Sequence, residues 1–156
     1  MMDPEPEPIG TVAELALRAQ AYACRTTADD DVETISLQTA KEYLEAQDIH
    51  ACESICNELI DGRETPRATR AAAYLIVASM RQDPLGQLHF VVDLYQAMYQ
   101  RMQIENNRKR EVKELLRRSE GLRNEAQAAS LRAQQERENA ERAREEWLKY
   151  EYGDWP

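Results

Sequence analysis

The side chains best suited to chemistry in this chain are its three cysteines and two histidines. Cys52 and Cys56 are four residues apart, which places both thiols on one face of an expected helix, with His50 nearby in the sequence. A metal site would need a further ligand at suitable spacing, and none is evident. Apolar neighbours such as Ile55 and Leu59 therefore favour reduced, inert thiols that act as small buried hydrophobic groups.

Catalytic patterns are missing from the rest of the sequence. His50 and His89 occupy nearly equivalent places in two similar segments, which favours a shared structural role. No glycine-rich phosphate loop, HExxH pair or metal-spaced Cys/His set is present, and the acidic run at residues 29–31 lacks the other ligands and the glycine of a calcium loop. The sequence predicts a protein that is not an enzyme and that has no cofactor, but it does not name an activity.

The composition predicts an all-α protein. The 156 residues fit one domain plus an extension, with 31% charged residues, only five Gly and abundant Ala, Leu, Glu, Arg and Gln. No apolar stretch approaches the roughly 18 residues that span a bilayer. The acidic, proline-rich N-terminus lacks the features of a secretory signal. We therefore expect no membrane span and a location in the cytoplasm or within a particle.

The net charge of −9 is unevenly distributed. Residues 1–65 contain 15 acids and 4 bases, a sum of −11; residues 66–110 sum to +4 and residues 111–156 to −2. This acidic front predicts a protein partner with a basic surface and disfavours general nucleic-acid binding, because phosphates would be repelled. The basic cluster at residues 108–110 is typical of a solvated helix face.

The chain divides into four predicted segments. Residues 1–10 contain three prolines and like charges, which predicts a disordered acidic tail. Thr11 and Glu14 form a capping box that begins a helical domain over residues 11–100. A coiled-coil helix follows over residues 101–152, and residues 153–156 form a short aromatic tail.

Within the helical domain, two segments repeat at a spacing of 35 residues. Each has a helix, a short turn and a second helix, with turns at Gln47-Asp48 and at Gln82-Asp83-Pro84. Equivalent positions carry related residues: Tyr43 with Ala78, Asp48 with Asp83, Ile55 with Phe90, and Leu59 with Leu94.

This pattern, over residues 33–98, resembles the tetratricopeptide helix–turn–helix repeat. The sequence departs from the family, because Gln47 and Gln82 replace the glycine of the turn, and the proline after the second helix comes late, at Pro66. A plain bundle of helical hairpins fits the same residues. The resemblance implies a protein-binding groove on the first helices and no catalysis. The side chains expected to line it are Tyr43, Leu44, Tyr74 and Leu75.

The last third of the chain repeats every seven residues, which favours a coiled coil over a single solvated helix. We expect the helix to continue from Leu88 through the polar stretch at residues 105–110, for a length of roughly 95 Å, although a bend into an antiparallel hairpin fits too. The predicted oligomerisation residues, which we name the stripe, are Val112, Leu115, Leu122, Ala126, Ala129, Ala133, Ala140, Ala143, Trp147 and Tyr150.

Aromatic residues gather at the C-terminus, where they either dock a partner or cap the end of the coil. Trp147 and Tyr150 lie on the stripe, whereas Tyr152 and Trp155 are the better candidates for partner binding.

Taken together, these patterns predict a homo-oligomeric adaptor, assembly factor or structural component. A small acidic chaperone of the secretion type, which binds a client segment in the repeat groove, is one alternative. A strut in a cell envelope or a virus-like particle is the other.

Overall fold

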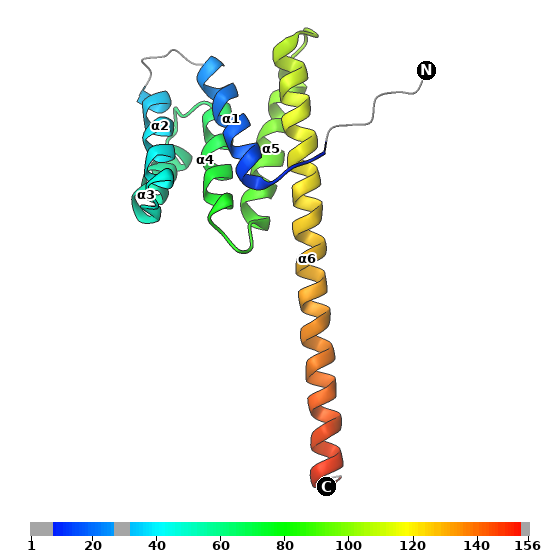
Figure 1. Ribbon diagram of the computed structural model, residues 1–156. Helices are drawn as coiled ribbons and strands as arrows, with labels where there is room; N and C mark the ends of the chain where they lie inside the picture. Colours follow the sequence, from blue (N-terminus) through cyan, green and yellow to red (C-terminus); the bar gives the residue numbers. More distant parts are fainter. Residues whose placement is uncertain (1–7, 27–31, 154–156) are drawn as a thin grey trace.

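The computed structural model describes residues 8–26 and 32–153, and this part of the chain is all-α, as predicted. Its helices are α1 (Val12–Thr26), α2 (Val32–Glu45), α3 (Ile49–Asp61), α4 (Arg67–Ser79), α5 (Leu85–Arg101) and α6 (Asn107–Tyr152). The first five form a bundle, and α6 lies along one side of it and then projects far beyond it (Figure 1).

The two expected helical hairpins are present, as α2–α3 and α4–α5, with turns where the sequence predicted them. Gln47, at the first turn, has a φ of 62°, the left-handed conformation in which the tetratricopeptide pattern prefers glycine. The turn is closed by the Asp48 N–H, which donates to the Tyr43 carbonyl at 2.8 Å. The Asp48 side chain then caps α3 by accepting from the N–H of Ala51 at 3.3 Å.

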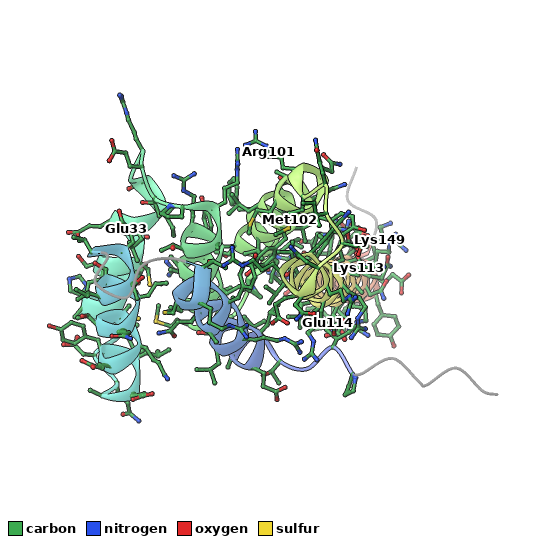
Figure 2. All side chains as sticks on the ribbon, turned by 90° about the horizontal axis from the view of Figure 1, so that it is seen from above. Glu33, Arg101, Met102, Lys113, Glu114 and Lys149 are labelled. Carbon is green, nitrogen blue, oxygen red and sulfur yellow. The ribbon has the colours of Figure 1, made fainter. Side chains whose placement is uncertain are left out.

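Helix α4 forms the centre of the core. Five of its alanines are buried, namely Ala68, Ala71, Ala72, Ala73 and Ala78, together with Leu75, Ile76 and Val77. Small side chains let neighbouring helices approach closely, and α1, α2, α3 and α5 all contact α4. Viewed from above, α2 lies at one edge of the molecule and α6 at the other, with α1 and α4 between them (Figure 2).

The chain turns back between α5 and α6, so the predicted continuous helix from Leu88 is wrong. Helix α5 ends at Arg101, and Asn106 starts α6 as its N-cap, with its Oδ1 accepting from the N–H of Lys109 at 3.0 Å. Lys109 is held there by Glu105, at 3.3 Å, and by the Tyr99 ring, whose centroid is 5.0 Å from Nζ. The polar stretch is therefore a helix cap, and α6 packs against α5 as an antiparallel neighbour.

The N-terminal segment crosses α6, which corrects part of the prediction of a disordered tail. Ile9 is partly buried against the core, and a Cβ at Gly121 would collide with its side chain. Gly121 thus provides the space in which Ile9 packs. Residues 1–7 of the predicted tail lie outside the described residues.

Candidate interaction surfaces

The stripe on α6 has two parts with different environments. Val112 and Leu115 have no exposed surface, and Leu122 is 6% exposed, because α1 and α5 cover them. These three residues belong to the core of their own chain, which corrects their assignment to an oligomer interface. Ala126, one helical turn beyond Leu122, is half-buried at the edge of this core. An apolar stripe looks the same in sequence whether its cover comes from the same chain or from another.

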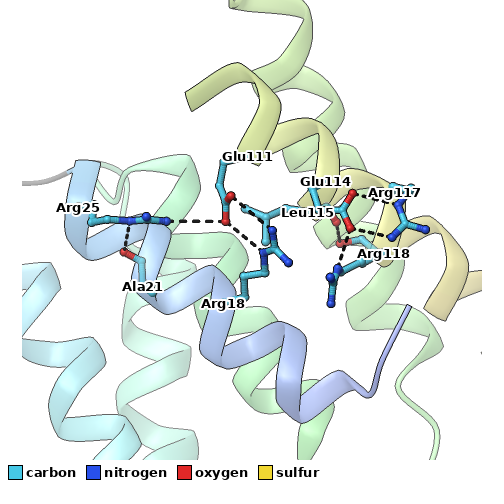
Figure 3. A network of polar contacts seen from close by, with 9 residues as sticks. Arg18, Ala21, Arg25, Glu111, Glu114, Leu115, Arg117 and Arg118 are labelled. Carbon is cyan, nitrogen blue, oxygen red and sulfur yellow. Dashed lines mark hydrogen bonds and ion pairs between the residues drawn. The ribbon is translucent and has the colours of Figure 1, made fainter. Parts of the chain in front are cut away.

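Ion pairs fix the first part of α6 to the bundle (Figure 3). The Glu111 carboxylate lies between two arginines of α1, 3.1 Å from Arg18 Nε and 3.7 Å from Arg25. One turn further on, Glu114 accepts from Arg117 at 2.7 Å and from Arg118 at 2.9 Å. These hydrogen bonds lower the pKa of Glu114 from 4.5 to about 2.

The second part of α6, residues 131–152, is exposed at every position, and we call it the projection. It is about 33 Å long at 1.5 Å per residue. Its large apolar side chains are open to solvent, with Trp147 55% exposed, Tyr150 86% and Tyr152 63%. The stripe residues Ala133, Ala140 and Ala143 are exposed as well. Trp155, the other predicted docking residue, lies outside the described residues.

A notch lies where the projection leaves the bundle. It has a volume of about 620 Å³, and one of its walls is the α4–α5 turn, at Gln82, Asp83 and Pro84. The other wall is the stripe face of α6, which contributes Ala126, Ala129, Ser130, Ala133, Glu136, Arg137 and Ala140. Sequence reasoning identified the four alanines of this wall, but not the turn opposite them.

The predicted groove residues do not form one surface. Leu75 has no exposed surface, so it is a core residue and the expectation that it lines a groove is wrong. Tyr74 stacks on Phe90, with ring centroids 5.1 Å apart, at the contact between α4 and α5. Tyr43 is 38% exposed on α2, whereas Leu44 is half-buried and faces α1 and α4. Of the four, Leu44 lines a cavity.

That cavity is a mainly apolar cleft of about 210 Å³ between α1 and α2, floored by α4. Leu17, Leu44 and Ile76 provide its largest apolar surfaces. The Gln20 amide crosses from α1 to donate to the Leu37 carbonyl of α2 at 3.4 Å, and Lys41 and Glu45 pair at the rim. The sequence showed the apolar face of α1 but could not show that α1 would lie beside the first helices of the repeats.

Both cysteines of α3 are buried, and burial raises the pKa of the Cys52 and Cys56 thiols. Protonated, shielded thiols are poor nucleophiles. Within residues 8–26 and 32–153, no group of three or more His, Cys, Asp or Glu side chains is placed to hold a metal ion. Over the same ranges, no helix has both the length and the apolar character needed to cross a membrane.

Comparison of the chain with protein-family models, with curated proteins and with solved structures gave no match in any of the three. What points to a function is therefore the geometry itself: a helix whose stripe is covered over one half and open over the other.

Proposed function

We propose that this protein is a non-enzymatic assembly component, an adaptor or structural subunit, which self-associates through the projection. The carrying observation is that residues 131–152 form helix and are exposed at every position, without cover from the described part of their own chain, while the stripe of the first half of α6 continues along them. The acidic bundle then remains free to bind a second partner with a basic surface.

The energetics of the projection support this proposal. Isolated helices are marginal in water, and side-chain contacts such as Gln134 with Glu138 and Gln135 with Asn139 add only about 0.2–0.5 kcal/mol each. Burying an exposed large apolar side chain contributes about 1.5–3 kcal/mol. The projection offers Trp147 and Tyr150 of each copy for this purpose. Association therefore stabilises both the interface and the helix itself.

The direct test is the molar mass of the full chain, measured by light scattering coupled to size-exclusion chromatography over a range of concentrations. A single copy has a mass of 18.0 kDa, so we expect at least twice that value. Ala140→Glu, on the stripe, should return the mass to one copy. Ala128→Glu is the matched control, because Ala128 is exposed on α6 and lies off the stripe.

A mass of one copy at every concentration would refute self-association. Assembly well beyond two copies would instead favour the strut-like structural component, because a closed pair does not grow.

The cleft between α1 and α2 supports a second candidate, a chaperone-like protein that binds a client segment. Its apolar floor and walls are open to solvent between two helices, with charged residues at the rim. An environment-sensitive apolar dye should bind the folded protein, and Leu17→Gln should weaken that binding. Leu131→Gln is a suitable control, since Leu131 is similarly exposed, at 60% against 53%, but lies on α6. Equal binding by both variants would argue against the cleft.

A further inference from the structure

The open part of the stripe, from Ala126 to Tyr150, carries small residues at one end and large residues at the other. Beside the notch it consists of Ala126, Ala129 and Ala133, and near the C-terminus it consists of Trp147 and Tyr150. We propose that a second copy of this chain lies antiparallel along the projection and places its two terminal aromatics in the notch. This inference rests on the proposed self-association and adds its orientation, its register and its docking site.

The position of the bundle excludes the parallel arrangement. The bundle covers the first half of the stripe, so it lies on the side of α6 that a partner helix would have to approach. Paired helices pack with their axes about 8–10 Å apart. In a parallel, in-register pair the two bundles would stand at the same height and on the facing sides, and they would occupy the same space. In an antiparallel pair they lie at opposite ends.

The length of the open stripe sets the register. The stripe emerges from the core at Ala126, and its last member is Tyr150, two residues before the helix ends. An antiparallel pair centred near Glu138 uses this whole length on both copies. Gly153, with a φ of 68°, ends the helix where it would reach the other bundle.

In this register every large residue meets a small one. Trp147 of the partner subunit faces Ala129, and Tyr150 of the partner subunit faces Ala126. The inner layers pair Ala133 with the partner's Ala143, and Glu136 with the partner's Ala140. Alternating large and small residues across a seam keeps the distance between helix axes constant. A parallel pair would instead stack Trp147 on its own copy, which demands a wider helix separation there than at the alanine layers.

The charges beside the stripe favour the same orientation. In a parallel pair, Arg132 would face Arg137 of the partner subunit, and Glu146 would face Glu151 of the partner subunit. In the antiparallel register, Arg132 faces Glu146 of the partner subunit, twice by symmetry. On the other flank, Arg137 faces Arg137 of the partner subunit. The Glu136 carboxylates in the adjoining seam offset the repulsion between these two arginines.

The notch has the shape that the aromatic end requires. It extends along α6 from Ala126 to Ala140, about 21 Å at 1.5 Å per residue. Pro84 of the α4–α5 turn forms an apolar part of the opposite wall, and the volume is about 620 Å³. An indole and a phenol side chain that enter from the partner helix would be covered on one side by alanines and on the other by the turn.

Disulfide trapping tests the orientation. In a background with Cys24→Ala, which removes the only cysteine that is not buried, Ala133→Cys and Ala143→Cys chains are oxidised separately and as a mixture. The antiparallel register predicts a cross-linked dimer from the mixture and none from either variant alone. A cross-linked dimer from Ala133→Cys alone would overturn it. Mixing Ala128→Cys with Ala143→Cys gives the control for random collision.

The docking site has a separate test. Ala129→Phe fills the notch, and we expect it to raise the dissociation constant of the full-chain dimer at least tenfold. Ala128→Phe adds the same ring off the stripe and should leave the constant within twofold. Equal constants for the two variants would overturn docking in the notch. A mass of 18.0 kDa for the unmodified chain at all concentrations would instead mean that the proposed function itself is wrong.

Discussion

The two halves of α6 share one heptad pattern but have opposite environments. From Val112 to Leu122, the stripe packs against α1 and α5, and Glu111 pairs with the arginines of α1. Over residues 131–152, the same stripe continues, exposed at every position, along the part of α6 that projects beyond the bundle (Figure 1). Heptad spacing therefore indicates that a helix will be covered on one face, but not which polypeptide covers it.

Residue size separates the two halves better than spacing does. The covered half carries Val112, Leu115 and Leu122, whose large side chains fill the core of the bundle. The open half carries alanines along most of its length and aromatics at its end. Within α6, the large aliphatic residues fill the core of the bundle, and the small residues of the open half permit close approach by a second helix.

The largest expected contrast is between two leucines of α6. Leu115→Ala creates a cavity in the core and should lower the free energy of unfolding by about 2–5 kcal/mol. Leu131→Ala removes the same atoms from a side chain that is 60% exposed, and its effect should stay within about 0.5 kcal/mol. Urea denaturation followed by circular dichroism gives both values. Similar losses for the two variants would show that the projection is packed in solution against its own bundle.

The fluorescence of Trp147 reports whether a partner helix covers the open half of α6. In a Trp155→Phe chain Trp147 is the only tryptophan, and its fluorescence should shift to shorter wavelength as the protein concentration rises. Trp147→Ala should raise the dissociation constant of the dimer about 10–100-fold, equivalent to about 1.4–2.8 kcal/mol. An emission spectrum that does not change with concentration would contradict burial of this ring by a partner.

Acid should lower the stability of the covered half of α6, because it protonates Glu114. Its pKa is about 2 in the folded chain against 4.5 for the free group, so its contribution to stability is complete above pH 4.5 and is lost as the pH falls through 2. Because the group lies near the surface, we expect a contribution of about 1 kcal/mol or less. Comparing Glu114→Gln with the unmodified chain by denaturation at several pH values measures it. Curves that stay parallel from pH 6 to pH 2 would contradict this assignment.

The smallest change in the free energy of unfolding is expected from a substitution at Gly121, where the N-terminal segment packs on the first half of α6. Alanine there favours the helix by about 1 kcal/mol but displaces Ile9, whose side chain is flexible. The two effects should nearly cancel, so Gly121→Ala should change the free energy of unfolding by less than about 1 kcal/mol. In an Ile9→Ala background, the same substitution should be clearly stabilising. If it is not, Ile9 does not pack at this position.

Local signals in the sequence predicted much of the fold. The Thr11 cap is confirmed by the bond from the Glu14 N–H to the Thr11 Oγ1 at 3.1 Å, and both helical hairpins turn where short polar segments interrupt the apolar pattern. The helix break before Asn107 matches the alternative of an antiparallel hairpin rather than the favoured continuous helix, and Asn106 is a favoured N-cap residue. Helix propensity of the neighbouring Glu, Arg and Lys residues was given more weight than the cap. The tetratricopeptide resemblance stays a prediction.

The candidate surfaces depended more on tertiary structure. The heptad spacing predicted the open part of the stripe, and its role as an interface stays a prediction, but the notch and the cleft each combine segments distant in sequence. The notch joins Pro84 to Ala126 across the α5–α6 hairpin, and the cleft joins Leu17 to Leu44 and Ile76. No periodicity within one helix can reveal which other helix it meets.

The sequence alone determined that this chain is helical, where most of its helices begin and end, and that one face of its last helix is apolar, because each of these depends on residues close together along the chain. Only the tertiary structure decided that the bundle covers the first half of that face and leaves the second half exposed to solvent. The turn at Asn106 determines which residues are covered, because it folds α6 back along α5. Val112, Leu115 and Leu122 thereby enter the core, and the remaining stripe residues lie beyond its edge.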